Sequence, residues 1–112
     1  MSKISFEDIG AVVATCQTAA TVQGGQMVKM EGNGIVTACN AGDAFCGVSM
    51  EPRNGLAGVQ FKGFMTVPYT GSVKVGWNTL CADGAGGVKT GESGVSALVI
   101  CINTDGTAVI CL

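Results

Sequence analysis

The chain has 112 residues with six basic and eight acidic side chains, a formal net charge of −2 at pH 7, and no histidine. This length corresponds to one domain, and a net negative charge with isolated basic residues excludes a nucleic-acid partner. Without histidine, acid–base chemistry near neutral pH would need Asp, Glu, Lys, Cys or Tyr, which are scattered along the chain. We therefore expect no catalytic residue, no metal ligand and no cofactor.

The low content of charged residues indicates a surface that is partly covered by a partner. Charged residues make up 12% of the chain, whereas a domain surface usually carries about 25–35%. We therefore expect an oligomer or a docked protein. No apolar run approaches the ~20 residues that span a bilayer, and the first residues lack a secretion signal, so we expect synthesis in the cytoplasm and no membrane partner.

Residues 1–22 differ from the rest, because no charged residue occurs from position 11 to position 22. Such a segment needs a surface to lie on, and two interpretations stay open. It is either a first strand or short helix on the chain's own core, or an arm that docks on a neighbouring molecule. Its apolar residues have a near-helical spacing: Phe6, Ile9, Val12, Val13 and Cys16.

Residues 23–112 have the pattern of a single β domain. Asn33-Gly34 separates the short apolar runs 26–30 and 35–38, which predicts a β-hairpin. Residues 59–69 alternate between apolar and polar positions, as a half-buried strand does. Within this run, Gly63 indicates a bend or bulge, and Pro68 indicates a strand end or a sheet edge.

The last third continues this pattern. Residues 79–82 and Val88 flank a glycine-rich turn, and residues 97–102 and 107–112 form two strands joined by residues 103–106. These last strands are almost wholly apolar, which predicts burial on both faces. We expect a mainly β fold: a compact single-domain β-barrel or β-tulip-like sandwich of short strands with tight glycine turns, preceded by an N-terminal arm.

A shift of 52 residues aligns glycines of the first half with glycines of the second half. The pattern suggests two related β units and an internal duplication. The aligned pairs are Gly24 with Gly76, Gly32 with Gly84, Gly34 with Gly86, and Gly42 with Gly94.

The six cysteines are expected to be reduced and buried, because nothing in the sequence indicates an oxidising compartment. No Cys-x-x-Cys pair occurs, so a zinc site is not expected. Exposed aromatic residues are better candidates for function, since large aromatic side chains often anchor interfaces. Phe64, Tyr69 and Trp77 are therefore interface candidates.

Three segments carry a resemblance to a known family: residues 42–49 (GDAFCGVS), 59–69 (VQFKGFMTVPY) and 75–80 (VGWNTL). In their order of turns and apolar steps they resemble the decoration, or capsid-stabilising, proteins of tailed-bacteriophage heads. The likeness covers about residues 24–112. It implies a compact β domain that binds the assembled head, commonly as trimers at local three-fold positions, and an N-terminal segment that often pairs with the capsid surface.

We therefore expect a virion structural protein, made in the host bacterial cytoplasm, whose partners are the major capsid protein and further copies of itself. No small-molecule substrate is implied. Three alternatives stay open: another virion component such as a tail or minor capsid protein, a small-molecule-binding β-barrel, and a secreted disulfide scaffold. Deletion of residues 1–16 is expected to abolish capsid binding and to leave the fold intact. The interface candidates are Ile4, Phe6, Ile9, Val12, Val13, Phe64, Tyr69 and Trp77.

Overall fold

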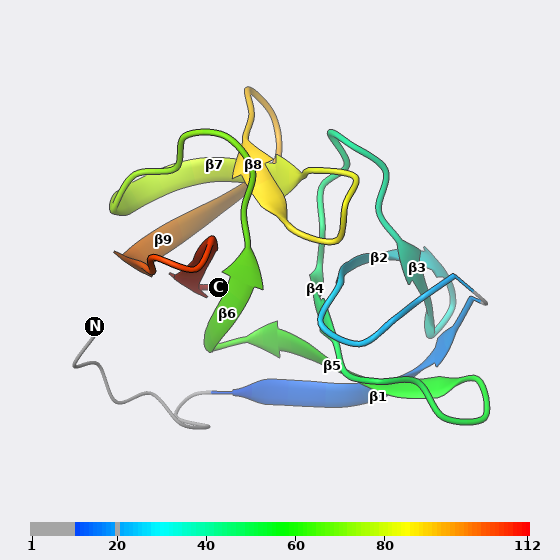
Figure 1. The fold of residues 1–112 in the computed structure, drawn as a ribbon. Helices are drawn as coiled ribbons and strands as arrows, with labels where there is room; N and C mark the ends of the chain where they lie inside the picture. The colour runs from blue at the N-terminus through cyan, green and yellow to red at the C-terminus, as the bar shows by residue number, and fades with distance from the viewer. Residues whose placement is uncertain (1–10, 20) are drawn as a thin grey trace.

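The computed structural model describes residues 11–19 and 21–112. Over these residues the chain forms ten strands: β1 (Val12–Thr18), β2 (Met27–Gly32), β3 (Ile35–Ala38), β4 (Gly47–Ser49), β5 (Leu56–Lys62), β6 (Phe64–Pro68), β7 (Gly76–Ala82), β8 (Val88–Thr90), β9 (Val95–Ile102) and β10 (Thr107–Cys111). The first five close into a barrel in the order β1-β3-β2-β4-β5, and the last five form a second sheet in the order β6-β10-β9-β7-β8 (Figure 1). The expected all-β fold with a barrel is confirmed.

The predicted hairpin is present as the antiparallel pair β2–β3. Gly32 lies opposite Ile35, so Asn33 and Gly34 form a two-residue turn. Gly34 has a φ of 69°, which residues with a Cβ atom rarely adopt. The Asn-Gly pair therefore sets the register of these two strands.

Gly63 divides one alternating run between the two sheets. β5 ends before it and belongs to the barrel, whereas β6 starts after it and belongs to the second sheet. Gly63 has a φ of 102°, and its N–H and C=O both bond to the backbone of Leu112. The predicted bend is confirmed, but residues 59–69 form two strands and not one. Pro68 ends β6, the first strand in the order of its sheet, as its lack of an N–H predicts.

The two sheets share one cyclic strand order. The 52-residue shift places β1 to β5 on β6 to β10. The barrel order β1-β3-β2-β4-β5 then becomes β6-β8-β7-β9-β10. The second sheet has this same order when it is followed in the opposite direction from β6 and its two ends are joined. A parallel bridge between Tyr69 and Val88 joins the two ends of that sheet, as the parallel pair β1–β3 does in the barrel. One five-stranded plan therefore occurs twice along the chain.

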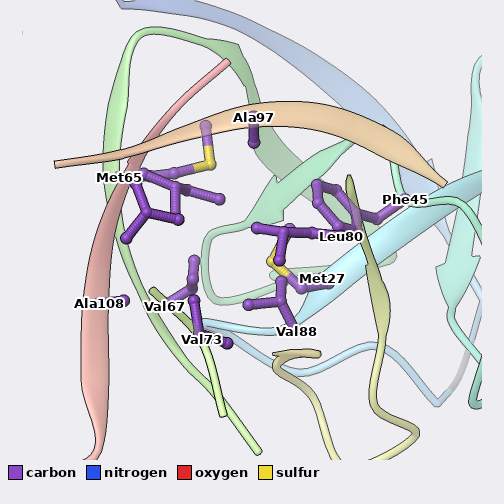
Figure 2. Packing of buried hydrophobic residues seen from close by; sticks show 11 residues of the cluster. Met27, Phe45, Met65, Val67, Val73, Leu80, Val88, Ala97 and Ala108 are labelled. Carbon is purple, nitrogen blue, oxygen red and sulfur yellow. The ribbon is translucent and has the colours of Figure 1, made fainter. Parts of the chain in front are cut away.

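Residues from both units fill one core. Met27 and Phe45 from the barrel half pack with Leu80 and Val88 in the cluster of the second sheet (Figure 2). Across the same junction the Met27 N–H donates to the carbonyl of Gly86 at 3.1 Å. A smaller cluster fills the barrel: Cys16, Val22, Val28, Val36 and Val59.

The outer face of β9 departs from the prediction of burial on both faces. Ala97 and Val99 are fully buried, but Leu98 and Ile100 are half-exposed. The second sheet curls around one core, so only the inner face of β9 contacts that core. The prediction is therefore wrong for the outer face of this strand.

Replacement of Leu80 by alanine is expected to lower the free energy of unfolding by about 2–5 kcal/mol, because it removes a fully buried side chain from the shared core. Leu56→Ala is the matched control, since Leu56 is 49% exposed, and should cost less than about 1 kcal/mol. Urea denaturation measures both values. Equal losses of unfolding free energy in the two variants, or two separate unfolding transitions, would contradict a core shared by the two units.

Candidate functional site

β1 is a strand of the barrel, and its two halves differ in burial. Cys16 faces the barrel interior and is buried, whereas residues 12–15 are exposed. Of the two interpretations of residues 1–22, the first strand on the chain's own core therefore holds for Val12–Thr18. The expectation that residues 1–16 can be deleted with the fold intact is wrong, because this deletion removes most of a barrel strand.

The first half of β1 has an open edge. On one side β1 pairs with β5 from Val12, opposite Lys62, to Gln17, opposite Leu56. On the other side β3 pairs only with Gln17 and Thr18. Within the described part of the chain, no strand pairs with this second side of residues 12–16. The N–H and C=O groups of such an edge are able to pair with a strand from another chain.

The hydrogen bonds at the end of β1 show which backbone groups face the open side. The Gln17 N–H donates to the carbonyl of Gly34 at 2.8 Å, on the side of β3, and the Thr18 N–H donates to the carbonyl of Gly55 at 2.9 Å, on the side of β5. Backbone groups alternate direction along a strand. The N–H of Thr15 therefore points to the open side, and that of Ala14 points to β5.

Apolar side chains flank this edge. Val12 is 53% exposed and Val13 is 46% exposed, and a bulge lies between them. A partner strand at the edge would cover both valines. The other three candidates of this segment, Ile4, Phe6 and Ile9, lie outside the described residues.

A second apolar surface lies on the outer face of the second sheet. Phe64 is opposite Cys111, Cys111 is opposite Leu98, and Leu98 is opposite Trp77, so these four residues form a row across β6, β10, β9 and β7. Trp77 is 73% exposed, and Phe64 and Leu98 are half-buried. We name this row, with the outward residues beside it, the Trp77 face.

The structure separates the aromatic candidates from one another. Tyr69 is half-buried and packs against the core cluster, away from the row that joins Phe64 and Trp77. Sequence reasoning missed Leu98, because an apolar strand does not indicate which of its faces stays uncovered. It also missed Val75, which is 64% exposed beside Trp77.

The carboxylates with resolved pKa shifts have structural roles. A hydrogen bond from the Lys29 ammonium, at 2.6 Å, lowers the pKa of Asp43 and joins β2 to the loop before β4. Burial alone would raise the pKa of Asp83, but hydrogen bonds from the Ala85 N–H, the Thr70 hydroxyl and the Gly87 N–H outweigh it and lower this pKa. These groups hold turns and loops in place.

Two of the cysteine thiols, those of Cys39 and Cys46, are poor nucleophiles. Burial, with the nearby Asp43 carboxylate, raises the pKa of Cys39 to about 11, and burial also raises the pKa of Cys46. Both thiols are thus protonated at neutral pH, whereas a nucleophile needs the thiolate. All six cysteines are free, and the described residues contain no group of three or more Cys, Asp or Glu placed to hold a metal ion.

A cavity of about 190 Å³ lies at the junction of the two units. Gln26 and Cys39 line one side of it, and the turn of residues 84–87 lines the other, with no charged side chain among the lining residues. It lies outside the barrel, whose interior is filled by valines such as Val28 and Val36. The cavity therefore provides no charged side chain to pair with a charged ligand.

Comparison with protein-family models finds no match to this chain, and comparison with curated proteins finds none either. Among the residues that the structure describes, no helix is long and apolar enough to cross a membrane.

Asp83→Ala is expected to destabilise the protein by about 1–3 kcal/mol at pH 7, because it leaves the N–H groups of Ala85 and Gly87 without their acceptor. The lowered pKa means that the carboxylate stabilises the fold above pH ~4 and stops doing so as the pH falls through its folded value. Denaturation curves from pH 7 to pH 3 should therefore show that the difference in the free energy of unfolding between the variant and the wild type becomes smaller below pH ~4. A constant gap would contradict this role, and the exposed Glu92→Ala serves as control.

Alkylation in denaturant without a reductant should modify all six cysteines, because every thiol is free. Mass spectrometry of the intact chain counts the modified groups. Three disulfides would leave none to modify, and that result would favour the secreted disulfide scaffold.

Proposed function

We propose that this protein decorates the assembled head of a tailed bacteriophage and stabilises its shell. The observation that carries the proposal is the open edge of β1 at residues 12–16, on a strand that β5 holds in place along its whole length. Because the edge is already ordered, a partner strand binds to it without the entropic cost of folding this side of the interface. Addition of a strand to an exposed sheet edge is a common mode of protein recognition.

The binding energy would come from two sources. Backbone hydrogen bonds at the edge contribute about 0.5–1.5 kcal/mol each, and coverage of apolar surface contributes about 25 cal/mol per Å². Val12 and Val13 supply that surface on β1. Residues 1–10, which carry Ile4, Phe6 and Ile9, continue from the same end of β1 and would extend the contact along the shell.

Stabilisation of the shell would follow from mass action. A ligand that binds only the assembled state stabilises that state by RT ln(1 + [L]/Kd), which is about 2.7 kcal/mol per site at a hundredfold excess over Kd. An icosahedral shell repeats this gain at many equivalent sites. No bond is made or broken, so the function needs no catalytic residue and no cofactor.

The resemblance in residues 42–49, 59–69 and 75–80 supports the identity of the partners. It points to the major capsid protein as the surface that is bound, and to a homotrimer as the form that binds. The protein would be made in the host cytoplasm and function in the virion. The low charge of the chain, 12% of its residues, supports a protein that is largely covered by partners.

Thr15→Pro is expected to abolish binding to the shell while the barrel stays folded. Proline removes the N–H that points to the open side and leaves the bonds to β5, and edge strands tolerate proline. The measurement is co-sedimentation with empty heads assembled from the major capsid protein encoded with this chain, with the thermal unfolding midpoint as the check on folding.

Two further variants complete this test. The N–H of Ala14 points to β5, so Ala14→Pro should lower the thermal unfolding midpoint. Comparison with Thr15→Pro thus distinguishes the paired side of β1 from its open side. Deletion of residues 2–10 leaves β1 in place and should weaken binding to the heads. A folded Thr15→Pro protein that sediments with the heads as the wild type does would overturn the proposal.

A further inference from the structure

We infer that the Trp77 face binds a second copy of this chain. The inference rests on the outer face of the second sheet, which is a different surface from the open edge of β1, and it does not depend on binding to a shell.

The face is a continuous surface across four strands. β10 pairs with β6 in one unbroken register, from Thr107 opposite Pro68 to Cys111 opposite Phe64. Because residues alternate sides along a strand, the fully buried Ala108 and Ile110 point to the core, and Cys111 points outward. The same argument places Leu98 and Trp77 outward beside Cys111, on β9 and β7.

The outward residues of these four strands carry no charge. They are Phe64, Thr66 and Pro68 on β6, Thr107, the buried Val109 and Cys111 on β10, Ser96, Leu98 and Ile100 on β9, and Trp77 and Thr79 on β7. Charged residues lie at the margin: Asp105 accepts hydrogen bonds from Thr107, Lys74 precedes β7, and Lys89 on β8 lies opposite Cys81. The apolar row runs from Phe64 on β6 through Cys111 and Leu98 to Trp77 on β7. An apolar surface with a charged margin is the usual anatomy of a protein interface.

The absence of charge selects the kind of partner. A charged surface would have to leave water without gaining an ion pair on this face, so a charged partner is disfavoured. A second copy presents the same uncharged apolar surface, and a two-fold axis brings this surface against itself. This contact pairs two chains and is separate from the contacts within a homotrimer. Two such sheets would stack face to face at ~10 Å with their side chains interleaved.

The size of the face sets the strength of the association. Four strands at a spacing of ~4.8 Å, each contributing about five residues at ~3.3 Å, cover on the order of 300 Å² of sheet area per copy. The total of about 600 Å² is below that of stable specific interfaces and far below that of obligate dimers. We therefore expect a folded monomer in reversible equilibrium with an oligomer.

Trp77 is the only tryptophan of the chain, so its fluorescence reports on this face directly. Sedimentation equilibrium and tryptophan emission, measured from 1 μM to 1 mM protein, should show self-association with a shift of the emission to shorter wavelength. Leu98→Lys keeps the fluorophore and should remain monomeric over this range. Trp77→Lys should also remain monomeric.

Leu56→Lys is the matched control, because it places the same charge at an exposed leucine of the barrel and should associate as the wild type does. Circular dichroism checks that each variant is folded. A wild type that stays monomeric at 1 mM would overturn the inference. Association that persists unchanged in both Trp77→Lys and Leu98→Lys would overturn it as well. Association with normal affinity in a Thr15→Pro protein that no longer binds heads would show that the two surfaces act separately.

Discussion

This structure depends on one constraint: the backbone N–H and C=O groups on the edge strands of each sheet need hydrogen-bond partners. Two five-stranded sheets would leave four open edges, and each sheet reduces this exposure by joining its first strand to its third in parallel. The barrel makes the join at Gln17 and Thr18, and the second sheet makes it at Tyr69 and Val88. Both joins are short and lie at one end of the strand. In the barrel, the unpaired remainder is the first half of β1.

This constraint also explains how the few polar side chains are used. Short strands need many turns, and turns leave backbone N–H groups that require acceptors. Asp83 accepts from two such groups in the turn between β7 and β8, and Asp105 accepts from the N–H and hydroxyl of Thr107 between β9 and β10. These two carboxylates therefore hold the turns of the second sheet in place.

Local patterns in the sequence predicted the local structure. Asn33-Gly34 predicted the hairpin, and Gly63 predicted the bend. The alternation of residues 59–69 predicted the burial of Val59, Met65 and Val67. The strand β1 was one of two open interpretations of residues 1–22, and the sequence did not decide between them, because its partner strand β5 is far away in sequence.

The candidate surfaces were predicted in part. Trp77 was named from its chemistry and is exposed. Val12 and Val13 were named from a near-helical spacing, but both lie in the strand β1, where a bulge separates them and both are exposed. The open edge at Thr15 and the exposure of Leu98 depend on how far β3 extends and how the second sheet curls, and these are properties of the tertiary fold.

The repeated strand order has a consequence for the autonomy of each half. Met27 and Phe45 belong to the first unit by sequence but complete the interior of the second. A polypeptide cut at Gly63 would thus yield one fragment with two apolar side chains lacking their surroundings, and one fragment with a hole where they belong. If a duplication produced this chain, its single-unit ancestor had the same incomplete core. A dimer of two such units would fill that core, and gene fusion would then join the two subunits in one chain.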